Sequence, residues 1–144
     1  MAIIAAGSNP AITDETVMTI SLYAASVPVF KQMLNALSDV LNKAEAHATA
    51  KNIEPNALLQ ARLFPDMFPL VRQVQIAVDF AKGVSARLAE IEVPKYEDSE
   101  VTFADLQALI AKVLAFVDTI KPEQIDGKEG IEIITRPCTP KEKR

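Results

Sequence analysis

Three stretches of this chain repeat apolar residues at alternating spacings of three and four, which is the period of a helix that packs in a bundle. Prolines lie at the boundaries of these stretches, and proline is tolerated in the first turn of a helix but breaks its interior. We therefore expect three long helices. The first starts at about Thr19. The second opens at Pro65 and Pro69, which a first turn tolerates, and ends near Glu92. The third stops at Pro122.

The apolar seam of each stretch predicts the buried face of its helix. Between the first two long helices, a short helix is expected over about residues 56–62. The predicted seams are Phe30, Leu34, Leu37, Leu41, Ala44 and Ala48 in the first helix, Met67, Val71, Val74, Val78, Ala81, Ser85 and Leu88 in the second, and Phe103, Leu106, Leu109, Ile110, Val113, Phe116, Val117 and Ile120 in the third.

Two helix starts have local signals. Pro28 lies either in the first turn of the first helix, after a cap at Ser26, or at a kink in a helix that begins near Ser21. Thr102 and Asp105 have the spacing of a capping arrangement, in which the two side chains satisfy the first N–H groups of the third helix.

The composition predicts one all-α domain, because the 144 residues are 49% hydrophobic and include only 4 glycines. We expect a loose leader over residues 1–17, a helical bundle domain over 18–122 and an irregular C-terminal segment over 123–144. A net charge of -4 argues against binding to nucleic acid. With one cysteine, no signal peptide and no stretch of membrane-spanning length, the chain is expected to be cytoplasmic.

Two large apolar residues of the second helix, Ile76 and Phe80, lie away from its seam. Apolar residues on the outer side of a helix indicate a further neighbour. That neighbour is either another helix of this chain or a partner chain, and we expect a homodimer that covers Ile76 and Phe80.

Polar residues run along one side of the same helix at spacings of three and four, and they are Arg72, Gln75, Asp79 and Lys82. In one interpretation they line an inter-helix groove, with Asp79 as a base and Arg72 as an anion clamp. In the other, which we favour, they form a solvated face with an Asp79–Lys82 pair. Gln73, at the edge of the seam, is expected to be half-buried and bonded to a neighbouring helix or chain.

The stretches "MTISLYAASVPVFKQMLNALSDVLNKAEAHA", "LLQARLFPDMFPLVRQVQIAVDFAKG" and "TFADLQALIAKVLAFVDTI" resemble the domain-of-unknown-function family numbered nineteen ninety-three, in the DinB-like metalloenzyme superfamily. The resemblance runs from Met18 to about Ile134. It implies an up-down-down-up four-helix bundle, commonly dimeric. The fourth helix of that family is missing here or replaced by a short tail, so a truncated product without its own activity is one interpretation of the chain.

The resemblance also implies a metal held by histidines, one on the second helix and a pair on the fourth. This chain has one histidine, His47, and shows Gln73, Gln75 and Asp79 where the second helix would supply one. A catalytic zinc or nickel site needs about three protein ligands, so we expect no native metal and no cofactor. His47 is expected to meet helix-end carbonyl groups or water, and Cys138 is expected to be an inert thiol.

From these observations we expect a metal-free, self-associating DinB-like helical protein that binds a small molecule or a partner in an inter-helix groove. The groove candidates are Arg72, Gln73, Gln75 and Asp79. The competing interpretation is a DinB-like metal-dependent hydrolase or transferase. The metal content of protein purified without added metal separates these two functions.

Overall fold

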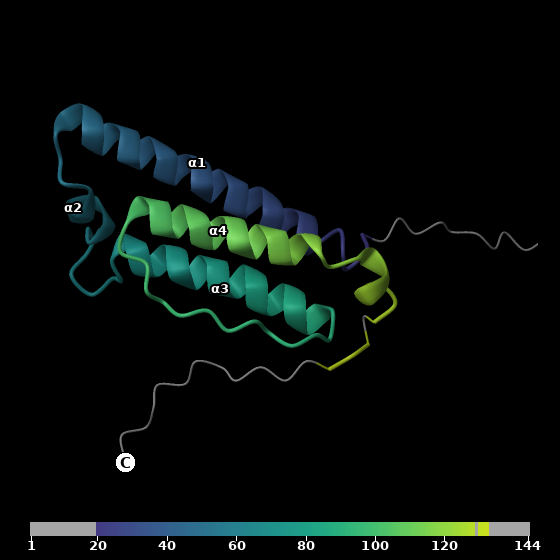
Figure 1. Cartoon of the computed structure of the whole chain (residues 1–144). Helices are drawn as coiled ribbons and strands as arrows, with labels where there is room; N and C mark the ends of the chain where they lie inside the picture. The colour runs from purple at the N-terminus through teal and green to yellow at the C-terminus, as the bar shows by residue number, and fades with distance from the viewer. Residues whose placement is uncertain (1–19, 129, 133–144) are drawn as a thin grey trace, which may run out of the picture.

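The computed structural model describes residues 20–128 and 130–132 of the chain (Figure 1). Its elements are the helices α1 (Val27–Lys51), α2 (Pro55–Leu59), α3 (Leu70–Leu88) and α4 (Phe103–Asp118), followed by the short 3-10 helix η1 (Pro122–Gln124). The described part of the chain holds helices and no strand, which confirms the predicted all-α class. The expected leader over residues 1–17 and Cys138 lie outside the described residues.

The start of α1 confirms the first of the two alternatives for Pro28. Ser26 takes the N-cap position and Pro28 lies in the first turn of the helix. The Ser26 hydroxyl does not cap the helix, because it donates to the Leu22 carbonyl oxygen at 2.7 Å. At the other end, Asn52 adopts a left-handed conformation with φ 52°, which asparagine tolerates better than most residues and which stops the helix.

The third helix, α3, is shorter at both ends than the sequence predicts. The Leu70 N–H donates to the Ala61 carbonyl oxygen at 3.1 Å, so the chain before Leu70 turns back onto the end of α2. Met67, which was predicted on the buried seam, lies in this turn and is 37% exposed. After α3, Glu90 has φ 56°, which ends the helix before the predicted boundary near Glu92.

The predicted capping arrangement at the start of α4 is confirmed. The Thr102 hydroxyl accepts the Asp105 N–H at 3.1 Å, and the Asp105 carboxylate accepts the N–H groups of Thr102 at 2.9 Å and Val101 at 3.1 Å. Three backbone donors that a helix start leaves unpaired are satisfied in this way.

Replacing the cap, Thr102→Ala, is expected to lower the free energy of unfolding by about 1 kcal/mol, because the first turn of α4 loses an acceptor. Urea unfolding followed by circular dichroism at neutral pH measures the loss. Thr119→Ala is the matched control, since Thr119 lies at the other end of α4 and its hydroxyl donates to the Phe116 carbonyl oxygen. Equal losses in the two variants would contradict a specific role for the cap.

The same cap makes stability depend on pH. The Thr102 side chain and the N–H groups of Val101 and Thr102 lower the pKa of Asp105 below its ordinary value of 3.8. A carboxylate with a lower pKa in the folded state stabilises the fold above its unfolded pKa, and this contribution disappears as the pH falls through the folded pKa. The stability difference between the unmodified chain and Thr102→Ala should therefore shrink below pH 3.8.

The three long helices are joined by two different kinds of connection (Figure 1). α1 and α3 run in opposite directions, with α2 in the turn between them. From the end of α3, the chain returns along the whole bundle before α4 begins, so α3 and α4 run in parallel. We call residues 89–102 the crossover. This is the up-down-down order that the family resemblance implies for the first three helices.

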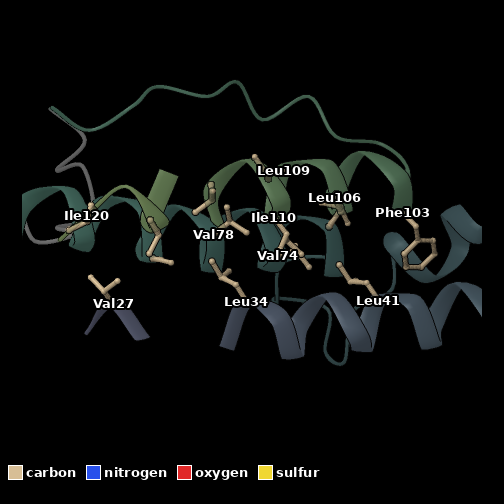
Figure 2. Close-up of a cluster of buried hydrophobic side chains, with 14 of the residues drawn as sticks. Val27, Leu34, Leu41, Val74, Val78, Phe103, Leu106, Leu109, Ile110 and Ile120 are labelled. Atoms are coloured by element: carbon tan, nitrogen blue, oxygen red, sulfur yellow. The ribbon is translucent and has the colours of Figure 1, made fainter. Parts of the chain in front are cut away.

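The buried core lies where α4 packs against both α1 and α3, while α1 and α3 contact each other much less (Figure 2). All three predicted seams supply it. One buried cluster contains Leu34 and Leu41 of α1, Val74 and Val78 of α3, and Leu106 and Ile110 of α4. The largest side chains that are fully buried are Leu41, Leu59, Phe103, Leu106, Ile110, Ile120 and Ile125.

One end of the bundle is closed by residues that follow α4. Ile125 is fully buried in the core cluster, and the neighbouring Asp126 carboxylate accepts the Tyr23 N–H at 2.8 Å. Lys31 of α1 pairs with Asp118 at the end of α4. The segment over 123–144, expected to be irregular, thus contributes Ile125 to the core.

Candidate functional site

The polar line of α3 faces the crossover. Arg72 forms an ion pair with Asp98, and its Nη1 also donates to the Gln75 side-chain oxygen at 3.2 Å. The Gln75 Nε2 donates to the Glu100 carboxylate at 2.9 Å. Gln75 is only 6% exposed, although it was expected on a solvated face. The expectation of a solvated face is therefore wrong at Gln75, because an acidic stretch of the chain covers it.

Lys82, further along the same line, is also buried. Its Nζ lies 2.6 Å from the Asp79 carboxylate, so the predicted Asp79–Lys82 pair is confirmed. Lys82 is nevertheless 5% exposed, which again contradicts a solvated face. The Tyr96 ring of the crossover explains this burial, because Lys82 Nζ lies 4.5 Å from the ring centre. Lys112 Nζ of α4 lies 3.9 Å from the same ring centre. Both distances are within the range of cation–π attraction.

These contacts explain why a helix with an apolar seam also carries a polar line. No backbone hydrogen bond joins residues 92–100 to another described residue, so side chains hold the crossover in place. Arg72, Gln75 and Lys82 supply the partners on α3. The crossover thus occupies the groove at Arg72 and Gln75, whereas Asp79 stays half-exposed beside Lys82.

The crossover residues that meet α3 were not singled out from the sequence. Tyr96, Asp98 and Glu100 are two positions apart, and in an extended chain such residues point to the same side. Tyr96 and Glu100 are half-buried, whereas Asp98 is exposed like its neighbours Glu97 and Ser99. The residue types of this stretch do not alternate between apolar and polar, so the sequence carries no periodic signal for a docked segment.

Gln73 lies apart from the other groove candidates. It is exposed, and its Nε2 donates to the Phe68 carbonyl oxygen at 2.8 Å. The expectation that Gln73 is half-buried and bonded to a neighbouring helix is wrong, because the turn before α3 lies within its reach. Gln73 thus helps to fix this turn.

The two interface candidates lie together on the outer side of α3. Phe80 is 64% exposed and Ile76 is partly exposed. They line a hollow of 250 Å³ together with Asp79 and Arg87. The structure therefore places both residues at the surface, as the sequence predicts.

Apolar residues are exposed on α1 as well as on α3. The buried residues of α1 form a line along the helix, and Ser38, on one side of this line, bonds to Gln107 of α4. Residues 33, 37 and 40 lie on the other side of the line. Met33 is 63% exposed and Val40 58% exposed. On α3, the side away from the crossover is apolar as well. We call this surface the α1–α3 face; it comprises Val29, Phe30, Met33, Leu37, Val40 and Ala44 of α1 with Leu70, Ala77, Phe80 and Val84 of α3.

The donor set does not fit the metal that the family resemblance implies. Gln75 is engaged by Arg72 and Glu100, and Asp79 by Lys82. His47 is exposed near the end of α1. Within residues 20–128 and 130–132, no three histidine, cysteine or acidic side chains are grouped closely enough to hold an ion. We therefore derive no chemistry from a metal.

The helices of the described region are also too short or too polar to cross a membrane.

Comparison with known proteins places this geometry in a family. The family model described as Domain of unknown function (DUF1993) matches residues 22–144. No curated protein matches the chain. A crystal structure of a DinB family member protein from Shewanella denitrificans is similar, with 42% sequence identity and a TM-score of 0.69. The match covers 72% of this chain and 59% of that chain. The chain thus belongs to the DUF1993 family and has the helical bundle fold of a DinB family member.

Proposed function

We propose that this protein is a cytoplasmic, metal-free interaction module that forms a homodimer through the α1–α3 face. The observation that carries the proposal is the exposure of Met33, Val40 and Phe80 on two helices that both pack against α4. Burying one large apolar side chain is worth about 1.5–3 kcal/mol. Contiguous apolar surface of this kind marks an interaction site.

A second copy of the chain is the occupant that we infer. Among the residues after α4 that the structure describes, Asp126 bonds to Tyr23 at the end of the bundle. In a twofold dimer the same surface serves both subunits, so one apolar face is covered by its own copy. α1 and α3 run in opposite directions. A helix of the second copy that contacts both is therefore antiparallel to one of them, and antiparallel neighbours are common in helical bundles.

The solution mass tests this proposal. Light scattering on a sizing column should give twice the chain mass of 15.7 kDa. Val40→Lys and Phe80→Lys should each shift the protein to the monomer at the same concentration, because each variant places a charge in the interface. Val101→Lys is the matched control, since Val101 is 68% exposed outside the α1–α3 face.

A compact monomer of the unmodified chain at high concentration would contradict the dimer. Metal analysis of the same sample, purified without added metal, tests the other half of the proposal. A stoichiometric transition metal would favour the competing function, a metal-dependent hydrolase or transferase.

A further inference from the structure

A hollow of 320 Å³ lies between the second half of α3 and the crossover. Its charged lining consists of three cationic side chains, Lys82, Arg87 and Lys95, and one carboxylate, Asp79. Because the whole chain is negative, with a net charge of -4, this excess of positive charge is a local feature. Clefts lined by one sign of charge attract ligands of the opposite sign.

The cations of this hollow are not equally engaged. Lys82 is paired with Asp79 at 2.6 Å. Arg87 and Lys95 form no ion pair with any other residue that the structure describes. The guanidinium of Arg87, which has five donors in a planar fork, is therefore free of a carboxylate partner within the described region.

Gly83 shapes the position of Arg87. A Cβ atom added at Gly83 would lie 2.7 Å from Arg87 Nη1, which is closer than such atoms approach. The guanidinium thus lies directly over Gly83, and a larger side chain there would make the flexible end of Arg87 move. This places the free donors of Arg87 beside the hollow that Gly83 also lines.

The remaining walls are apolar. Val93, Pro94 and the Tyr96 ring complete the lining. Tyr96 packs against the core, and the ammonium groups of Lys82 and Lys112 lie near its ring, so the ring has a defined place in this wall. A guanidinium next to a fixed aromatic wall suits a ligand with an anionic head and an apolar body, since arginine binds carboxylates through two parallel hydrogen bonds.

We propose that this hollow binds small monocarboxylic acids with a compact apolar or aromatic body, with the carboxylate on Arg87 and Lys95 and the body against Tyr96 and Pro94. The Asp79 carboxylate on the same wall disfavours ligands with two negative charges. The volume is at the lower end of small-molecule sites, which range from about 300 to 1,000 Å³. A ligand of one ring and a carboxylate matches this size.

The site rests on other observations than the proposed dimer. Its crossover wall includes Pro94, Lys95 and Tyr96, whereas Arg87 and Asp79 also line the hollow of Ile76 and Phe80. The titration below measures benzoate binding and not the solution mass, so a failure of the dimer test does not affect this inference.

The experiment is a titration of the full chain with benzoate, followed by NMR shifts of the backbone amides and the Arg87 side chain at constant ionic strength. Benzoate should shift Arg87 and Tyr96 signals in a saturable way. Benzamide, which has the same ring without the charge, should bind at least about tenfold more weakly, because a hydrogen bond to a charged group is lost.

Two variants test the assignment to Arg87. Arg87→Gln should weaken benzoate binding about tenfold, because it removes the guanidinium. Arg62→Gln is the matched control, because Arg62 is an exposed arginine outside the hollow whose Nη1 reaches only the Pro65 carbonyl oxygen. Equal binding of benzamide and benzoate, or equal effects of Arg87→Gln and Arg62→Gln, would overturn the proposal.

Discussion

Leu106→Ala is expected to lower the free energy of unfolding by about 2–5 kcal/mol, which is a large share of the stability of a domain of this size. Leu106 has no exposed surface and lies on α4, the helix that packs against both α1 and α3. Truncating it removes apolar contacts and leaves a cavity at the point where the three helices meet (Figure 2). Urea unfolding followed by circular dichroism measures the loss.

Leu114→Ala provides the control for this prediction. Leu114 lies two turns further along α4 and is partly buried against the same core. Its truncation should cost less than half as much, because the side chain already contacts water and the site opens to solvent. If the two variants were equally destabilised, the core would not be centred on the contact of α4 with both neighbours.

Asp79→Asn is expected to lower the free energy of unfolding by about 1–3 kcal/mol, although the Asp79 side chain is 50% exposed. The reason lies in its partner, since Lys82 has a side chain only 6% exposed. Without the carboxylate, the Lys82 ammonium stays buried with the Tyr96 ring as its remaining partner. Asparagine is nearly isosteric with aspartate and has a similar helix propensity, so the loss measured by urea unfolding reports the charge.

Lys82→Met shows whether the stability loss of Asp79→Asn comes from an unpaired buried charge or from lost packing. Replacing a buried charge by an apolar side chain of similar volume is often neutral or stabilising, so Lys82→Met should change stability by less than about 1 kcal/mol. The double variant should resemble Lys82→Met alone, because no buried charge remains to be compensated. An Asp79→Asn variant as stable as the unmodified chain would show that solvent reaches Lys82.

The helices of this protein could be predicted from the sequence because their signals are local. The seam residues Leu34, Leu41 and Ile110 recur at the helical period, and all three are buried. The start of α4 was marked by Thr102 and Asp105. The start of α3 was placed too early at Met67 because the pattern of apolar residues continues into the turn. There the spacing of apolar residues belongs to an exposed turn and not to a helix.

The role of the polar line was not predictable from its own helix. Arg72, Gln75 and Lys82 have the spacing of a solvated helix side, and nothing within α3 distinguishes water from a covering segment. The partners Asp98 and Tyr96 are supplied by the crossover, from 14 to 26 positions away. The candidate site therefore depends on the parallel arrangement of α3 and α4, which periodicity alone does not determine.

The central position of α4 also determines when the chain can fold during its synthesis. α1 and α3 are made first but contact each other little, and the bond between Ser38 and Gln107 spans 69 positions. Domains fold from the ribosome as units, and contacts between distant positions form slowly. The nascent chain must therefore wait, with the seams of α1 and α3 uncovered, until α4 and the Ile125 segment have emerged. During that interval its apolar seams are open to aggregation.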